Sequence, residues 1–422
     1  MLITRALRVL FFAAAAALLC GVSCEGEPAQ ETPPPGEEDT TPLPEGPAGI
    51  FAALRGKPAK TGGWADAANE GAGLTYTNPA DFILIDDASF PDPVEKRTAF
   101  TNAINSKDEA FIILSGLIDL SDGKISDSDH GYFDQFDSSG NRTNRDITFK
   151  IENNKTIIGV DSARVAFGGL RISGRQNIII RNIAFWDAHG STEKDTSLAG
   201  NADSKASIDA LVVEEGADII PSGIWIDHCA FSDGTCNDMI RNFHHDGSFD
   251  IRDAHFLTVS WCEFYNHDKV MLVGSSDSSP YLTPEGRQIT LHHNYFHHTT
   301  QRTPRTRGTQ MHIYNNYWKN TGVVGNSGYC MGPGRNAQFI VENNFFDTGT
   351  FQPTTKVIDF YDAASYPALV FQADNNVTFA YSNYDSTAHA KPWTPPYPYT
   401  LDEAAALPES IPAGAGNVLE WD

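Results

Sequence analysis

The chain has 422 residues, 41% of them hydrophobic, and carries a formal net charge of -24 at pH 7. This length and apolar content are enough to bury a large core, as one large domain or as two ordinary ones. The excess of acids argues against a basic surface of the kind that binds nucleic acid nonspecifically, so we expect no nucleic-acid partner.

Residues 1–24 have the pattern of a secretory signal. Arg5 and Arg8 precede a short apolar run, VLFFAAAAALL, and small residues follow before Cys24. The run is too short to predict a membrane-spanning helix. GVSC resembles a bacterial lipoprotein cleavage box, although Gly21 stands where Leu is usual, so a lipid anchor on Cys24 and simple secretion both stay open. Either route exports the protein, as a secreted protein or as a lipoprotein of the cell surface or outer membrane.

Residues 25–50 differ in composition from the rest of the chain. The stretch EGEPAQETPPPGEEDTTPLPEGPAG is acidic and rich in proline, and it contains no Lys or Arg. Such a segment cannot bury apolar surface, which predicts a disordered tether. We therefore expect the folded domain to occupy residues 51–422, and we expect it to be monomeric.

Short β-rich runs recur through the middle of the chain. Examples are FIILSGLIDL, NIIIRNIAFWDA, GIWIDHCAFSD, QITLHHNYFHHT and QFIVENNFFD. Several of them end with a polar pair and an aromatic residue, and the aromatics are 33, 32, 22 and 28 residues apart, at Phe231, Phe264, Phe296, Trp318 and Phe346. An asparagine stands two positions before three of these aromatics, at Asn294, Asn316 and Asn344.

A step near 22 residues, lengthened by insertions, is typical of a solenoid in which each coil adds short strands to parallel sheets. The asparagines would then hydrogen-bond from coil to coil, beside a stack of aromatic rings. We therefore predict an all-β protein, a right-handed parallel β-helix with loop insertions that form a cleft on one face. The spacing alone leaves an irregular antiparallel β-sandwich open.

Cysteines and histidines do not indicate a metal site. Four cysteines lie beyond the signal, at Cys229, Cys236, Cys262 and Cys330. Export permits disulfides, and Cys229 with Cys236 would close a short loop, whereas no CxxC pair is present to hold zinc. Adjacent histidines on a strand point to opposite sides, so we expect no shared zinc site from the pairs His244–His245, His292–His293 and His297–His298.

Three longer segments resemble the pectate lyases of polysaccharide lyase family 1. They are WIDHCAFSD, FDIRDAHFLTVSWCEFYNHDKVMLVGSSD and QRTPRTR, in the order in which that family carries them. The resemblance runs from TGGW at Thr61 to the neighbourhood of Asn417, with a small departure at Gly308, which comes one position earlier than usual. It implies a parallel β-helix, in agreement with the repeat, and an enzyme that cleaves polygalacturonate, the de-esterified pectin chain, by β-elimination.

The arginine-rich stretch HTTQRTPRTRG fits this chemistry. A base removes the C5 proton beside the carboxylate of a sugar, and cations at that carboxylate stabilise the enolate-like transition state. By resemblance, Arg302 matches the proposed catalytic base, and Lys269 and Arg307 match catalytic residues that bind the substrate carboxylate. Arg305 would bind substrate or form a structural salt bridge. Because a guanidinium normally keeps its proton, water or hydroxide could instead take the C5 proton while Arg302 stabilises charge.

The resemblance also implies calcium as a cofactor. Asp209 in SIDALVV, with Asp246 and Asp250 in HHDGSFDIR, matches the metal ligands of the family, and carboxylate oxygens are ligands that Ca²⁺ prefers. Some members of the family carry a further acid two positions before the first of these aspartates, where this chain has Ser207. Calcium binding would then be weaker, or substrate carboxylates and water would complete it.

Three other functions remain as alternatives. A pectin lyase, which acts on methyl-esterified substrate, lacks the calcium acids, so Asp246, Asp250 and Lys269 argue against it. A polygalacturonase needs NTD and GHG motifs, which are absent, and the single DD pair, Asp86–Asp87, lies far upstream of the repeats. A non-catalytic β-helix that binds cell-wall polysaccharide would not need these cations beside these acids.

Overall fold

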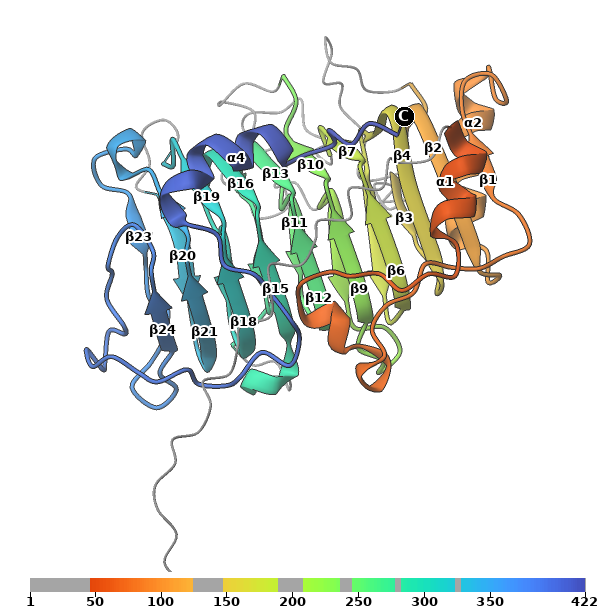
Figure 1. Ribbon diagram of the computed structural model, residues 1–422. Coiled ribbons are helices and arrows are strands. Elements are labelled where there is room, and N and C mark those ends of the chain that lie inside the picture. The colour runs from red at the N-terminus through yellow and green to blue at the C-terminus, as the bar shows by residue number, and fades with distance from the viewer. Residues whose placement is uncertain are drawn as a thin grey trace, which may run out of the picture. The chain divides into compact units, whose positions relative to one another are not determined.

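Short strands stack in parallel along successive coils of the chain (Figure 1). The computed structural model describes residues 46–123, 147–188, 208–235, 245–277, 282–322 and 328–421. Every pairing between named strands in these ranges is parallel, and each strand pairs with the strands of the coil before and the coil after. This arrangement confirms the predicted parallel β-helix and excludes the antiparallel sandwich.

The strands form three rows, two of which join at the long strand β4. The first row contains β1 (Ile83–Ile85), β2 (Ala110–Asp119), β4 (Lys155–Ala166), β6 (Gln176–Arg181), β9 (Ser222–Asp227), β12 (His255–Ser260), β15 (Gln288–His292), β18 (Thr309–Tyr314), β21 (Ala337–Glu342) and β24 (Leu369–Ala373). The second contains β7 (Ala184–Trp186), β10 (Ala230–Ser232), β13 (Glu263–Lys269), β16 (Tyr295–Gln301), β19 (Tyr317–Lys319) and β22 (Phe345–Phe346). The third is a separate sheet of β3 (Thr148–Lys150), β5 (Gly169–Ser173), β8 (Leu211–Glu214), β11 (Phe249–Ile251), β14 (Leu272–Val273), β17 (Arg305–Thr306), β20 (Tyr329–Pro333) and β23 (Lys356–Ile358).

Three α-helices pack against the coils, at two places. Helices α1 (Gly46–Leu54) and α2 (Pro93–Asn105) lie at the β1–β2 end, and α4 (Leu407–Gly414) lies over β19, β16 and β13 (Figure 1). The carboxylate of Asp92 caps α2 by accepting hydrogen bonds from two backbone amides, and Phe100 of this helix enters the main core. Short 3₁₀-helices span Trp64–Ala67, Asn69–Gly71, Pro284–Gly286, Thr348–Thr350 and Ala404–Ala406. No helix among the described residues is long and apolar enough to cross a membrane.

The predicted tether ends earlier than expected. Residues 46–50 belong to α1, and Ile50 is fully buried against the outer face of the first coils, where it shares a cluster with Phe111 and Ile158. The prediction was wrong here because it followed the proline-rich composition past the point at which an apolar helix begins. The signal, Cys24 and the tether up to residue 45 lie outside the described residues.

The predicted stacks of aromatics and asparagines are both present. Neighbouring rings of Phe231, Phe264, Phe296, Trp318 and Phe346 stack with centroids 4.9, 5.1, 5.0 and 4.6 Å apart. The Nδ2 group of Asn294 donates to Asn316 Oδ1, Asn316 donates to Asn344 in the same way, and Asn344 continues the ladder to Asn375. The repeated polar position therefore satisfies buried backbone groups at a turn between two rows of strands.

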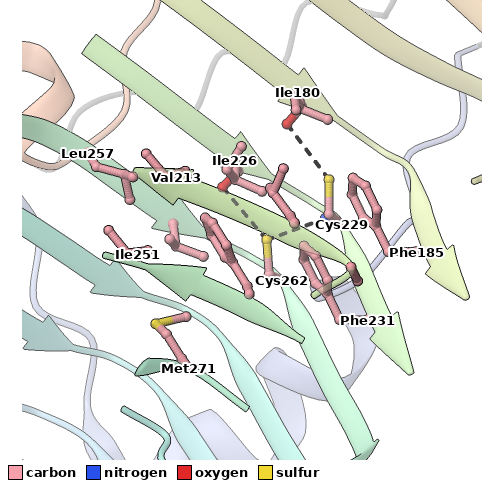
Figure 2. Packing of buried hydrophobic residues seen from close by; sticks show 14 of the residues in the cluster. Ile180, Phe185, Val213, Ile226, Cys229, Phe231, Ile251, Leu257, Cys262 and Met271 are labelled. Carbon is pink, nitrogen blue, oxygen red and sulfur yellow. Dashed lines mark hydrogen bonds between the residues drawn. The ribbon is translucent and has the colours of Figure 1, made fainter. Parts of the chain in front are cut away.

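Two cysteines occupy the same ladder position in the preceding coils. The amide of Cys262 donates to Asn294 Oδ1, and the amide of Cys229 lies 3.4 Å from the sulfur of Cys262 (Figure 2). The thiol of Cys229 faces the carbonyl oxygen of Ile180 inside the core, and Cys229, Cys262 and Cys330 are all free and buried. The Cys229–Cys236 disulfide that the sequence left open is therefore not formed, because Cys229 belongs to the internal ladder rather than to a loop. Cys236 lies outside the described residues.

Replacing Asn316 by alanine is expected to lower the free energy of unfolding by about 3 kcal/mol or more. The substitution leaves several buried polar groups without a hydrogen-bond partner, and each such group costs about 1–3 kcal/mol. Its side-chain nitrogen donates to the carbonyl oxygens of Leu291 and Tyr314, and its oxygen accepts from the Asn294 amide. Chemical denaturation measures the loss. Asn375→Ala, at the half-buried end of the ladder, should cost clearly less, and equal losses would contradict this account.

Candidate active site

Adjacent coils bring the predicted cations together. Lys269 is the last residue of β13 and pairs with Gln301, the last residue of β16, so that Arg302 follows one position later on the next coil. Gly247 forms a parallel bridge with Lys269, which places Asp246 one coil earlier. Strand register alone therefore gathers Asp246, Lys269 and Arg302 at one edge of the β-helix.

Arg302 sits at a sharp change of direction between β16 and β17. Its φ is 61°, in the left-handed region, and the peptide bond between Thr303 and Pro304 is cis. The carbonyl oxygen of Arg302 accepts a hydrogen bond of 2.7 Å from the amide of Met271, which ties this turn to the preceding coil. Its Nε atom is buried and has no hydrogen-bond partner among the described residues. Among the described residues no carboxylate forms an ion pair with this guanidinium, which therefore remains available to an external anion.

Lys269 and Asp246 form a close ion pair. The Lys269 Nζ atom lies 2.6 Å from Asp246 Oδ1, and the two side chains are 21% and 35% exposed. Both groups are therefore accessible from solvent, unlike the deeper carboxylates beside them.

Asp209 and Asp250 lie deeper and face each other across Gly247. Asp250 pairs with Val212 of β8, and Asp209 lies just before that strand. The Gly247 amide donates to Asp209 Oδ1 at 2.8 Å, and the Leu272 amide donates to Asp250 Oδ1 at 3.0 Å. A Cβ atom at Gly247 would lie only 2.6 Å from Asp250 Oδ1 and 2.8 Å from Asp209 Oδ1. Glycine is required here because the two carboxylate oxygens converge on this space.

Burial, together with the crowding of acids, raises the pKa of two carboxyl groups. Burial raises the pKa of Asp250 to about 6; repulsion from Asp246 adds to this rise, while the Leu272 amide and the charges of Arg252 and Arg302 oppose it. Burial, followed by repulsion from Asp250 and Asp246, raises the pKa of Asp209 well above its usual range. A cation bound among these groups would relieve the repulsion.

Arg252 is a site residue that sequence reasoning missed. Its guanidinium donates to Asp209 Oδ2 at 3.0 Å and to Glu214 Oε2 at 2.9 Å. Arg252 follows Asp250 by two positions in FDIR, so its place next to the acids was the available signal. Arg252 thus binds Oδ2 of Asp209, while Oδ1 of the same carboxylate faces Gly247.

Arg305 and Arg307 make different contacts from those expected. The Arg307 Nε atom donates to Asp277 Oδ1 at 2.7 Å, and its NH1 group donates to the Gly274 carbonyl oxygen at 3.1 Å. The guanidinium carbon of Arg305 lies 3.9 Å from the ring centroid of Tyr361. Among the described residues Arg305 forms no salt bridge, so the structural ion pair considered for it is replaced by this cation–π contact.

The sequence of this chain also matches a known protein family. The model of the family described as Pectate lyase matches residues 40–417, which include every predicted site residue.

The chain belongs to the pectate lyase family.

Individual relatives agree with this assignment. The chain is 40% identical over 182 residues to a pectate trisaccharide-lyase of Thermotoga maritima, covering 42% of this chain and 44% of that protein. It is 31% identical over 290 residues to a pectate lyase of Bacillus subtilis, covering 64% of this chain and 66% of that protein. The chain thus spans less than half of the length of the Thermotoga relative. A solved pectate lyase from Acidovorax avenae subsp citrulli shares the fold, with a TM-score of 0.65 at 19% identity over 92% of this chain and all of that one.

The acids of this pectate lyase family member are of the ligand type that calcium prefers. Asp209 and Asp250 direct carboxylate oxygens to one space that only glycine leaves open, and hard oxygen ligands are those that Ca²⁺ selects. Asp246 stands close enough to affect both pKa values, but its carboxylate is held by Lys269. No group of three or more His, Cys, Asp or Glu side chains within the described ranges has the geometry to hold a metal by itself. Ser207, the position of the family's further acid, lies outside those ranges.

Proposed function

We propose that this protein is a calcium-dependent pectate lyase that cleaves polygalacturonate by β-elimination and releases unsaturated oligogalacturonides. The observation that carries the proposal is the Arg302 guanidinium, whose buried Nε has no partner among the described residues and which lies one coil from Lys269 and two coils from Asp246. Family membership supports the same reaction. A solved pectate lyase of the same fold, 22% identical, is described as bound to a hexasaccharide, which supports an oligosaccharide ligand.

The proposed reaction breaks the bond between C4 and the glycosidic oxygen. The C5 proton is removed, the electron pair of the C5–H bond forms the C4=C5 double bond, and the oxygen leaves with the C4–O electron pair and takes up a proton. Negative charge builds on the carboxylate of the same sugar during proton removal. Preorganised cations at that carboxylate lower the barrier because their interaction strengthens as the charge grows.

The four cations divide three roles in this proposal. Lys269 and Arg307 bind the carboxylate of the reacting sugar, Arg305 binds a neighbouring part of the chain, and Arg302 takes the C5 proton. Asp209, Asp250 and Asp246 would hold calcium, which when bound would add positive charge at the substrate carboxylate. The Asp246 carboxylate would exchange part of its contact with Lys269 for the metal, leaving the lysine amino group for the substrate.

Polygalacturonate at alkaline pH with calcium is expected to yield product that absorbs in the ultraviolet, because elimination conjugates the new double bond with the carboxylate. Chelation of calcium should abolish the absorbance increase, and added calcium should restore it. A rise in reducing ends without absorbance would mean hydrolysis and would overturn the proposal. Absorbance from methyl-esterified pectin alone would instead favour a pectin lyase, and binding without any cleavage would favour a polysaccharide-binding protein.

We also propose that the protein is exported, as a secreted enzyme or as a lipoprotein anchored through Cys24, and that it acts as a monomer. The basic and apolar pattern of residues 1–24 supports export. Metabolic labelling with a fatty acid, compared between the native protein and Cys24→Ala, separates a lipid anchor from simple secretion.

A further inference from the structure

A buried series of carboxylates and imidazoles leads to the site from the preceding coils. Asp187 directly follows β7 and Asp233 directly follows β10, on neighbouring rungs joined by a hydrogen bond of 2.8 Å from the Asp187 amide to the Ser232 carbonyl oxygen. His245 Nε2 lies 2.7 Å from Asp187 Oδ1, and His245 Nδ1 lies 3.7 Å from Asp233 Oδ2. Asp233 Oδ1 is hydrogen-bonded to Nδ1 of His267 in β13.

The series ends on the backbone of two site residues. His267 Nε2 lies 3.1 Å from the carbonyl oxygen of Asp246 and 3.2 Å from that of Lys269. Carbonyl oxygens only accept hydrogen bonds, so this ring nitrogen carries a proton and donates to both. Asp246 and Lys269 are also joined through their side chains at 2.6 Å. One imidazole therefore ties together the main chains of the two residues that form the ion pair.

These groups cannot act by touching the polysaccharide. The side chains of Asp187, His245, Asp233 and His267 are each at most 3% exposed. Buried charged and polar groups are expensive to desolvate, and well-packed apolar residues of similar volume are often as stable. A role in placing other residues gives a physical reason for this buried polar series.

We propose that His267 and Asp233 are positioning residues of the active site. Asp233 fixes the plane of the His267 ring, and the ring holds the carbonyl groups of Asp246 and Lys269 on their two coils. The Lys269 amino group is thereby kept at the place where the substrate carboxylate would bind. The inference depends on the proposed function for its catalytic consequence, but the positioning itself is a structural claim that can be tested separately.

Two substitutions of similar size separate the two sides of the ring. The amide nitrogen of His267→Gln can replace Nε2 and still donate to the carbonyl oxygens, whereas that of His267→Asn replaces Nδ1 and loses them. Each variant leaves one side of the former ring without its contact, so both are expected to lose stability. We expect kcat on polygalacturonate to fall by about tenfold to 10²-fold in His267→Asn, the range that a misplacement near 1 Å produces. The kcat of His267→Gln should exceed that of His267→Asn by about fivefold or more.

His312→Gln is the matched control. His312 is a fully buried imidazole that pairs with Glu342 at 3.2 Å, and it lies in β18 of the first row of strands rather than at the site. It should lose stability without a change in kcat. If His267→Asn does not fold, Asp233→Asn takes its place, with an expected several-fold loss of kcat and little change in KM.

Crystal structures of wild type and variants provide a readout that does not depend on activity. In His267→Asn the Lys269 Nζ–Asp246 Oδ1 distance should lengthen, and in His267→Gln it should be kept. An unchanged distance in both, or equal kcat in the two folded variants, would overturn the positioning role. If wild type itself makes no unsaturated product, the proposed function fails, and the crystallographic comparison still decides whether His267 positions the pair.

Discussion

Replacing Arg302 by alanine is expected to lower kcat on polygalacturonate by about 10³-fold or more, because it removes both a positioned proton acceptor and a cation beside the developing charge. The melting temperature should stay close to that of wild type. The Nε atom of Arg302 has no partner among the described residues, so its removal breaks no ion pair within them. Initial rates of ultraviolet absorbance at saturating substrate and calcium measure the effect.

Arg302→Lys distinguishes the two roles that an arginine can play here. Lysine keeps the positive charge but changes the shape and the position of the proton-bearing group. If Arg302 removes the C5 proton, both variants should be nearly inactive; if it acts by charge alone, lysine should recover a large part of the rate. Arg175→Gln, which breaks the pair with Glu152 away from the site, is the control and should leave kcat unchanged. Near-full activity of Arg302→Ala would refute the catalytic assignment.

Replacing Asp250 by asparagine is expected to weaken calcium binding by about tenfold to 10²-fold, because it removes the negative charge from a buried carboxylate that faces Asp209 across Gly247. The effect should also depend on pH. The pKa of Asp250 is raised to about 6, so in wild type the calcium affinity should fall as pH drops through this value and the carboxylate takes up a proton. The variant should lose this contribution to the pH dependence. Isothermal titration with Ca²⁺ from pH 5 to 8 measures both.

Stability without calcium should show the same titration with a defined sign. The unfolded chain releases the proton of Asp250 near pH 4, whereas the folded protein keeps it up to about pH 6. Between these values the unfolded state binds fewer protons, so the free energy of unfolding falls as pH rises. Asp250→Asn should flatten this decline. Asp66→Asn is a control, since burial also raises the pKa of Asp66 but its partners are Thr61 and Gly62, and calcium affinity should not change.

Much of the fold could be predicted because the β-helix repeats its interactions. A residue such as Phe296 or Asn316 meets an equivalent residue one coil away, so the spacing in the sequence reports directly on contacts in space. The place of Cys229 in the ladder was not recognised, because a cysteine there replaces the repeated asparagine and suggests a disulfide instead. The beginning of α1 was missed because a proline-rich composition extends into it.

The candidate site was harder to predict than the fold, and not all of its residues were named. The family resemblance located Arg302 and the acids, but side-chain partners depend on which loops bring which coils together. Arg252 was passed over because its contact with Asp209 joins positions 43 residues apart, with no periodic signal. The carboxylate–imidazole series was missed for the same reason, since His267 reaches the site through main-chain oxygens that no side-chain motif can reveal.

The placement of the site among the coils has a consequence for how the protein comes apart. The site uses the coils of β8, β11, β14 and β17, and the same sheet continues through β5 and β3 on one side and β20 and β23 on the other. In a structure whose units touch only their neighbours, opening begins at the ends, where one interface rather than two holds each unit. The terminal coils should therefore unfold before the central coils that carry the site. On heating, the amides at the candidate active site should be among the last to exchange their hydrogens with solvent.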